Sequence, residues 1–345
     1  PKPNLQEFEA LTELDELRRL VSDLQAKLRR SQTKTADLIL AVHEGSRDAA
    51  VILGNPPAVD PPKPDKRKGS EEVALLHVSD WQYGKVTQSF SSQIARERVD
   101  ELSRLVVKLT NIERADHPVR ECHVMLGGDM VEGVTIFPGQ VFEIDGPLLP
   151  QIFGVAGAGE AMLRTLLGNF EKVVCWEEPG NHGRLGRKGD HPERDSADLL
   201  VYRLIRERLA PYEADGRLVW NETQGWHSIV EIGEYRALLV HGDEIKSFGG
   251  NIPAFGISRK VNAWATGVVA PFTDCYLGHF HQPLVLPLAH GKGRIFVNPS
   301  LESDNVYAQE FVGATGTPGQ RLNFISPKRG RVTTERIVWL DEESK

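Results

Sequence analysis

The sequence has few cysteines, no long apolar run and no excess of basic residues, and each of these absences excludes a class of protein. Three cysteines occur among 345 residues, at positions 122, 175 and 275. They are widely spaced, odd in number and set among apolar residues, which predicts buried strand thiols rather than a disulfide framework or a cysteine metal site. No apolar stretch approaches the roughly 20 residues that span a bilayer, so we expect no membrane association.

The balance of charge is acidic, with 41 Lys and Arg against 48 Asp and Glu, a formal net charge of −7. Proteins that bind nucleic acid over a broad surface usually carry a basic face, so this balance argues against such a binder and leaves room for a local basic cleft. The first residues lack the basic-then-apolar pattern of a secretory signal, and we therefore expect a cytoplasmic protein.

Three regions differ in composition. Residues 4–42 carry leucine and valine at spacings of three and four, which predicts an amphipathic helix that either forms a short coiled coil or caps the main domain. A proline-rich, charged segment follows and is typical of a linker. We expect a helical region over residues 1–53, through which a homo-oligomer would form, a linker over 54–70 and one large domain over 71–345.

From residue 72 onward, short apolar runs alternate with helical patterns. Strands are expected over residues 73–78, 121–126, 172–176, 236–240 and 274–277, and helices over 94–112 and 154–170. This alternation predicts βαβ units and an α/β fold. Runs at 295–297, 320–325 and 333–340 are typical of hairpin strands, so the sheet system is expected to end antiparallel.

Polar residues among small ones follow five of the expected strands. In chain order these motifs are Ser79-Asp80-Trp81-Gln82, Gly127-Gly128-Asp129, Gly180-Asn181-His182, His241-Gly242-Asp243 and Gly278-His279-Phe280-His281. Open α/β sheets place their chemistry at strand ends, and carboxylate, imidazole and amide oxygen are ligands for divalent metals. One such histidine carries little information, but five motifs in order predict a site for two ions about 3.5–4 Å apart.

These motifs resemble those of the calcineurin-like metallophosphoesterase family, whose blocks DxH, GD, GNH, H and GHxH occur in this order. Four of the five blocks match literally, between residues 73 and 300. The resemblance implies an α/β fold in which two sheets pack as a β-sandwich flanked by helices. It makes residues 71–345 a metallophosphoesterase domain that follows the N-terminal helical extension.

The resemblance also implies two metal ions and assigns their ligands. One ion would be held by Asp80, Gln82, Asp129 and His281, and the other by Asp129, Asn181, His241 and His279, so that Asp129 is shared. His182 would bind no metal and would act as the general acid or as a phosphate contact. The two ions would lower the pKa of a bridging water and hold the phosphate for in-line attack.

Gln82 departs from the family pattern, which has histidine at this position. Because an amide oxygen is a harder ligand than imidazole, we expect the site to prefer Mn²⁺, with Mg²⁺, Fe and Zn²⁺ as alternatives. The other interpretation is a scaffold that has lost the first metal site. Near the motifs, Glu132 is a candidate partner of the site residues, whereas His77 and His123 lie inside strands and are expected to pack.

Two groups of cations follow the third and fourth motifs. Arg184, Arg187 and Lys188 lie in a glycine-rich loop and are candidates for binding substrate phosphates, with a solvated loop as the alternative. Lys246, Arg259 and Lys260 occur near Phe248, Phe255 and Trp264, a mixture typical of single-stranded nucleic acid binding that core aromatics would also produce. Residues 133–150, rich in glycine and proline, are expected to form a loop over the site.

A second resemblance, to phage and prophage metallophosphoesterases of the exonuclease type, is carried by residues 133–140, 180–184 with 186–189, and 241–243 leading to 249–250. Together the two resemblances imply a hydrolase, a two-metal phosphodiesterase that acts as a nuclease on DNA. The alternatives are a phosphatase or cyclic phosphodiesterase for small nucleotides, and a catalytically weak assembly protein on the same fold.

Overall fold

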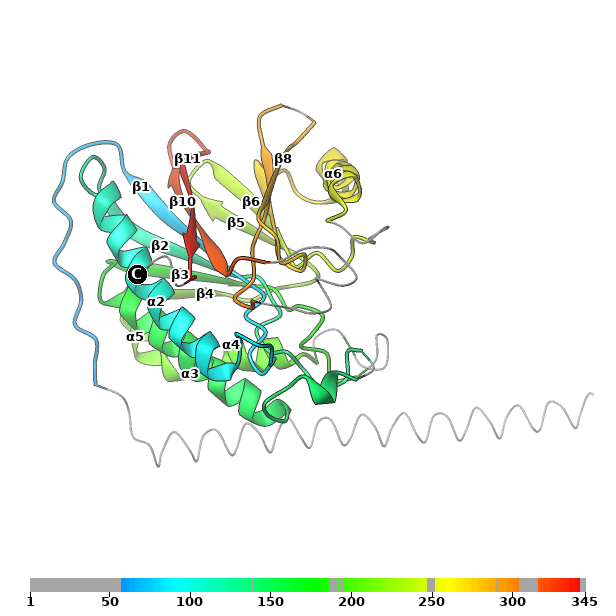
Figure 1. The fold of residues 1–345 in the computed structure, drawn as a ribbon. Helices are drawn as coiled ribbons and strands as arrows, with labels where there is room; N and C mark the ends of the chain where they lie inside the picture. The colour runs from blue at the N-terminus through cyan, green and yellow to red at the C-terminus, as the bar shows by residue number, and fades with distance from the viewer. Residues whose placement is uncertain are drawn as a thin grey trace, which may run out of the picture. The chain divides into compact units, whose positions relative to one another are not determined.

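The computed structural model describes residues 57–137, 139–186, 192, 195–246, 252–289, 291–303 and 316–341, drawn in colour in Figure 1. The helical region predicted over residues 1–53 lies outside the described residues and stays a prediction. Within the described ranges, no helix has the length and apolar character needed to cross a membrane.

The domain is built from two β-sheets and helices. The strands are β1 (Glu72–Val78), β2 (Val119–Leu126), β3 (Lys172–Glu177), β4 (Leu218–Asn221), β5 (Ser228–Ile232), β6 (Tyr235–Val240), β7 (Asp274–Leu277), β8 (Leu284–Pro287), β9 (Arg294–Val297), β10 (Gly319–Ser326) and β11 (Arg331–Trp339). The helices are α2 (Ser92–Glu113), α3 (Leu148–Leu167), α4 (Ala197–Arg208), α5 (Ala210–Ala214) and α6 (Ala254–Ala263), with the short turns η1 (Gln140–Phe142) and η2 (Trp264–Val268).

Both sheets are mixed. The first has the order β11-β10-β1-β2-β3-β4, and the second has the order β5-β6-β7-β9-β8. Strands β1 to β4 are parallel, as are β6, β7 and β9, while β10, β11, β5 and β8 pair antiparallel. Because parallel strands end at the same edge of a sheet, the polar motifs after β1, β2 and β3 share one edge, and those after β6 and β7 share another.

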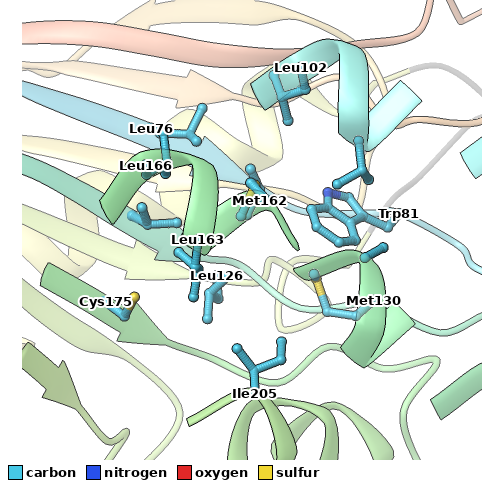
Figure 2. Packing of buried hydrophobic residues seen from close by; sticks show 14 of the residues in the cluster. Leu76, Trp81, Leu102, Leu126, Met130, Met162, Leu163, Leu166, Cys175 and Ile205 are labelled. Carbon is cyan, nitrogen blue, oxygen red and sulfur yellow. The ribbon is translucent and has the colours of Figure 1, made fainter. Parts of the chain in front are cut away.

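The sheets pack face to face, and helices cover their outer faces. Leu75 of β1 belongs to the cluster between the sheets, together with Tyr276 and Phe296 of the second sheet. Its neighbour Leu76 points to the opposite face and belongs to the cluster that also contains Leu163 of α3 (Figure 2). Successive strand residues point to opposite faces, so a strand buried on both sides is apolar throughout, as β1 is. The predicted two-sheet α/β fold flanked by helices is confirmed.

The expected strands and the helix expected over 94–112 agree with the observed elements to within a few residues at their ends, whereas α3 begins at Leu148, six residues before the expected start at residue 154. The predicted strand at residues 274–277 has the bounds of β7, and β10 with β11 forms the expected antiparallel hairpin. Strands β4, β5 and β8 and helices α4 to α6 were not predicted. The three strands have four or five residues and are only partly buried, whereas the equally short β7 is buried throughout.

The three cysteines lie in β2, β3 and β7, where they are buried and free, as the sequence predicts. In the described part of the predicted linker, the Val59 amide donates to the Tyr212 hydroxyl (2.9 Å) and the Asp65 amide to Glu171 (2.7 Å). These hydrogen bonds attach the segment to the domain. The boundary of the linker at residues 54–70 stays a prediction.

The packing of α3 on the first sheet generates a stability prediction. Leu163 is fully buried on α3, whereas Leu149 on the same helix is 36% exposed. Truncation of Leu163 to alanine leaves a cavity, and we expect the free energy of unfolding to fall by about 2–5 kcal/mol. For the matched Leu149→Ala change we expect a loss below about 1 kcal/mol. Urea unfolding followed by circular dichroism measures both, and equal losses would contradict the assigned buried face.

Candidate metal centre

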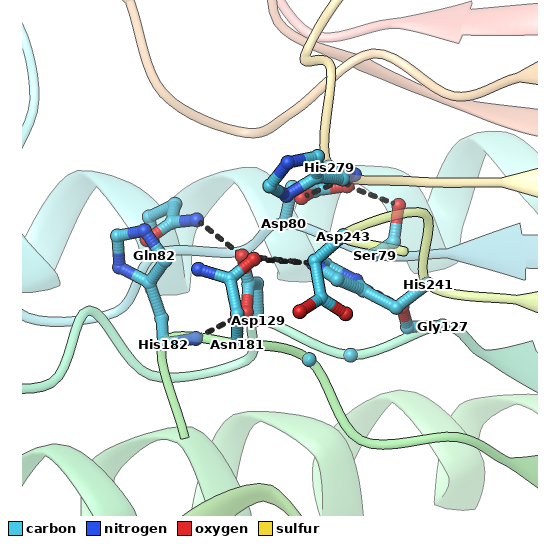
Figure 3. A network of polar contacts seen from close by, with 12 residues as sticks. Ser79, Asp80, Gln82, Gly127, Asp129, Asn181, His182, His241, Asp243 and His279 are labelled. Atoms are coloured by element: carbon cyan, nitrogen blue, oxygen red, sulfur yellow. Dashed lines mark hydrogen bonds and ion pairs between the residues drawn. The ribbon is translucent and has the colours of Figure 1, made fainter. Parts of the chain in front are cut away.

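Seven predicted ligands lie close together. They follow the ends of β1, β2, β6 and β7 or lie in the loop after β3. Figure 3 shows the side chains of Asp80, Asp129, Asn181 and His241 pointing toward one another. The His241 Nε2 atom lies 3.1 Å from Asp129 Oδ2 and 3.2 Å from Asn181 Oδ1. The His281 Nε2 atom lies 3.2 Å from Asp80 Oδ1. Residues up to 201 positions apart in the sequence, Asp80 and His281 among them, thus form one cluster.

Within this cluster, two trios have the geometry of metal sites. One is Asp129, His241 and His279, and the other is Asp80, Asp129 and His281; in each, the possible ligand atoms lie within 4.8 Å of one another. Asp129 belongs to both trios, as expected of a shared ligand. The donor set of carboxylate and imidazole suits a divalent cation. That these residues bind metal stays a prediction.

The backbone of the cluster is strained. Among the described residues, five that are not glycine have a positive φ: Asp80 (54°), Gln82 (46°), Asp129 (53°), His279 (65°) and His281 (56°). Each of them is a predicted metal ligand. The left-handed conformation is unfavourable for residues other than glycine, by about 1–3 kcal/mol each, and it persists only where the surrounding structure holds it. Concentration of this strain at one place indicates a functional site.

The electrostatics of the cluster hold its carboxylates ionised. Burial alone would raise the pKa of Asp129, but the nearby His241 and His182 outweigh burial and keep the pKa well below its usual value. Likewise, burial opposes and His281 favours the ionised form of Asp80, whose pKa is lowered. Burial would lower the pKa of His241, yet the Asp129 carboxylate raises it to about 10. A cation entering the cluster therefore meets negative ligands.

Gln82 has an unsatisfied amide. Its Nε2 donates to Asp129 Oδ2 (3.3 Å) and lies 3.4 Å from His281 Nε2, whereas its buried Oε1 has no hydrogen-bond partner among the described residues. A buried polar atom without a partner is costly. Rotation of the amide by 180° exchanges the two atoms and directs Oε1 to the cluster, so the residue fits the role of an oxygen ligand.

His182 lies beside the trios and is held by Glu132. Its backbone amide donates to Asp129 Oδ1 (2.7 Å), and its Nδ1 lies 2.7 Å from the Glu132 carbonyl oxygen and 3.4 Å from Glu132 Oε2. Because a carbonyl oxygen only accepts, Nδ1 carries a proton. Burial lowers the pKa of His182, but Asp129 and Glu132 outweigh it and raise the pKa to about 9. The candidate role of Glu132 as a partner of the site residues agrees with this contact.

Two acidic residues of the site were missed by sequence reasoning. Glu302 accepts from His281 Nδ1 (2.5 Å), which directs the other ring nitrogen toward Asp80. Asp198, in the first turn of α4, accepts from the backbone amides of Asp129 (2.9 Å) and Gly180 (2.8 Å). No motif marks these residues, because their partners lie far away in the sequence.

Asp198 joins two of the motifs at close range. The second and third motifs approach so closely that a Cβ atom on Gly128 would lie 2.3 Å from the Gly180 nitrogen. Glycine is therefore required at position 128, which also has a φ of 86°. The Asp198 carboxylate supplies the hydrogen bonds that hold both loops, and burial raises its pKa to about 6.

Of the three cations predicted to bind phosphate, the structure describes only Arg184. Arg184 is ion-paired with Asp243, which follows the fourth motif. Arg187 and Lys188 lie outside the described residues, as does Phe248. Trp264 is 4% exposed and packs in the cluster under α6, so it is a core aromatic, whereas Phe255 is 82% exposed. Binding of substrate by the three cations stays a prediction.

A groove of about 1360 Å³ lies beside the cluster, and its wall includes Gly180 of the third motif and Asp243 of the fourth. Its wall includes Trp220, Trp226 and Trp264. Acidic residues outnumber basic ones in the wall: Glu177, Glu178, Asp195, Glu207, Glu213, Glu222, Asp243 and Glu244 against Arg184, Arg203, Arg206 and Lys260. The three arginines each form ion pairs with acidic wall residues. Phosphate binding here would have to compete with those pairs.

Several solved structures are similar to this chain at low identity. An archaeal phosphodiesterase has 11% identity, covering 77% of this chain and 99% of its own, with a TM-score of 0.35. A conserved uncharacterized protein of Streptococcus pneumoniae TIGR4, named as a predicted phosphoesterase, has 14% identity. The match covers 79% of this chain and 99% of that protein, with a TM-score of 0.32. Vps29 of Entamoeba histolytica, solved with Zn²⁺, has 12% identity, and the match covers 78% of this chain and 99% of that protein with a TM-score of 0.32. No protein-family model and no curated protein sequence matches the chain.

The hydrogen bonds of Asp198 generate a second prediction. The Asp198 Oδ2 atom accepts from the Asp129 and Gly180 amides, and Oδ1 accepts from the Met130 amide (3.1 Å). In Asp198→Asn an NH₂ group replaces one of these two oxygens and cannot accept, so at least one backbone donor loses its partner. We expect the free energy of unfolding to fall by about 2–4 kcal/mol. The same change at Asp195, which lies just before α4, serves as the control. Urea unfolding at pH 7 measures both, and equal small losses would show that Asp198 does not hold the loops.

Glu178, at the end of β3, generates a prediction about pH. Burial raises its pKa to about 8, against hydrogen bonds from Ser228 and Thr223 that lower it. Between about pH 4.5 and 8 the folded chain therefore keeps a proton that the unfolded chain releases, and the free energy of unfolding falls as pH rises. The slope is at most about 1.4 kcal/mol per pH unit. Glu178→Gln removes this contribution. As the pH increases from 5 to 8, the free energy of unfolding of the variant should therefore approach the wild-type value or exceed it. A wild-type to variant difference that is constant with pH would refute the assignment.

Proposed function

We propose that the protein is a metal-dependent phosphodiesterase that hydrolyses nucleic acid, with DNA as the substrate. The observation that carries this proposal is the set of five strained residues, each a predicted ligand, arranged so that Asp129 serves two trios. Two divalent ions, when bound, supply a water of lowered pKa and positive charge for the phosphate oxygens. Mn²⁺ is the expected ion because Gln82 offers an amide oxygen.

The residues of the chain have separate tasks in this proposal. Asp80, Asp129 and the ligand histidines hold the ions and fix the distance between them. His182 binds the phosphate or gives a proton to the leaving oxygen, since its Nδ1 is fixed on the Glu132 carbonyl and its Nε2 is left for the substrate. Its side chain is 16% exposed, which permits contact with a bound phosphate.

The groove beside the cluster bears on the size of the substrate. Its volume of about 1360 Å³ exceeds the roughly 300–1,000 Å³ of a pocket for one small molecule, which supports a polymer over a mononucleotide. Of its three tryptophans, Trp220 and Trp264 are buried, whereas Trp226 is half-buried. Trp226 is therefore the tryptophan that offers a face on which a base can stack, a contact that does not depend on charge. The groove contribution to affinity is therefore expected to come from bases more than from phosphates.

A hydrolase of small nucleotides is the second candidate. The acidic wall favours it, because a polyanion would meet repulsion along the groove whereas a single phosphate needs only the ions. The two candidates require the same metal centre and differ in what they bind beyond the scissile phosphate.

The test is cleavage of end-labelled single- and double-stranded DNA beside a small phosphodiester and a phosphomonoester, with Mn²⁺, Mg²⁺ or EDTA. We expect DNA cleavage that needs Mn²⁺ and that falls about 10²–10⁴-fold in His182→Ala. Calorimetry should show that this variant still binds Mn²⁺. Turnover of the small esters alone would transfer the proposal to the second candidate, and metal binding without turnover of any substrate would overturn both.

A further inference from the structure

A second cluster of possible ligands lies at the other end of β1. It consists of Glu72 at the start of β1, Glu113 at the end of α2 and His117 in the turn before β2, whose ligand atoms lie within 4.8 Å of one another. Figure 1 shows the start of β1 beside the end of α2. The length of β1 separates this cluster from the candidate metal centre by about 20 Å. It is therefore a site of its own, independent of the proposed phosphodiesterase.

The two carboxylates of this cluster are only partly compensated: burial raises the pKa of Glu113, and the nearby charge of Arg336 lowers it by less than burial raises it. Glu72 is 3% exposed, and its Oε2 atom has no hydrogen-bond partner among the described residues. Within the same part of the chain, no lysine or arginine forms an ion pair with Glu72 or Glu113 at 4.0 Å or less. Glu113 accepts one hydrogen bond, from Thr334 (3.1 Å). Buried carboxylates this close need either a shared proton or a cation.

The histidine is oriented with Nε2 toward the carboxylates. His117 Nδ1 lies 3.1 Å from the Ser70 carbonyl oxygen, and because that oxygen only accepts, Nδ1 carries the proton. The other ring nitrogen, Nε2, faces Glu72 and is the atom that would bind an ion. A backbone carbonyl behind the ring is the usual support of a metal-bound histidine.

The spacing also suits an ion between the side chains. His117 Nε2 lies 4.0 Å from Glu72 Oε1, which is too long for a hydrogen bond. Two ligands at about 2.1 Å from one ion lie roughly 3–4 Å apart, so an ion between them accounts for the gap. The His117 side chain is 35% exposed, which gives an ion access from solvent.

We propose that Glu72, Glu113 and His117 form a binding site for a divalent transition-metal ion such as Zn²⁺. The ion joins the start of β1, the end of α2 and the following turn, and it neutralises two carboxylates that form no ion pair with a lysine or arginine among the described residues. Its role is structural: it stabilises the edge of the first sheet at which residues 57–71 enter β1.

The test compares Zn²⁺ binding to the full chain and to His117→Ala by calorimetry and metal analysis. We expect the wild type to bind one more equivalent of Zn²⁺ than His117→Ala, or to bind that equivalent at least about ten-fold more tightly. The Zn²⁺-dependent rise in Tm should shrink in the variant. Asp129→Asn is the matched control, since it should affect the other class of ions and leave this equivalent in place.

Glu113→Gln provides a second variant in case His117→Ala folds poorly. The change removes one ligand of the proposed ion, and it also removes the carboxylate that could share a proton with Glu72. A Zn²⁺ equivalent that depends on Glu113 therefore distinguishes a bound cation from a shared proton. Loss of the same Zn²⁺ equivalent in Glu113→Gln supports the site. Unchanged Zn²⁺ stoichiometry and affinity in the variants would overturn the proposal and leave a proton shared between Glu72 and Glu113 as the explanation. Because the readout is binding, the result does not depend on whether the chain cleaves DNA.

Discussion

The Asp129 carboxylate is the contact on which the candidate metal centre depends. It lies 3.1 Å from His241, accepts from the His182 amide at 2.7 Å and belongs to both ligand trios, so it connects motifs from both sheets. Its backbone is left-handed, and a residue in that conformation needs external support. Asp198 supplies the support by accepting from the Asp129 amide. Strain at the site is thus balanced by a hydrogen bond from a helix that carries no ligand.

The same arrangement places acidic and basic groups of the site against one another. His241 and His281 lie against Asp129 and Asp80 at 3.1 and 3.2 Å, and these contacts offset part of the negative charge. A bound cation would take over that task and would reduce the basicity of the histidines that ligate it. Ion binding and proton release are therefore coupled at this centre, as they are wherever histidine and carboxylate share a ligand sphere.

Charge elsewhere in the domain follows the tertiary pairing more than the local sequence. The glycine-rich loop after the third motif looks basic along the chain, yet Arg184 pairs with Asp243 from the fourth motif. In the groove, acidic side chains from several elements surround Arg206, which pairs with Glu213 and Glu222. The loop sequence is basic, but the groove that it borders has more acidic than basic side chains in the folded domain. This limits how much contacts with phosphates can contribute to the binding of a substrate.

The sequence by itself determined the α/β class, the positions of the long strands and the seven residues that converge at the strand ends. Each of these depends on local patterns: apolar runs long enough to be recognised, and small or polar residues where a strand must end. Only the tertiary structure decided the roles of Asp198 and Glu302, the ion pair of Arg184 and the cluster of Glu72, Glu113 and His117. These depend on contacts between distant segments, and no local pattern records which side chains will meet when separate strands and helices pack.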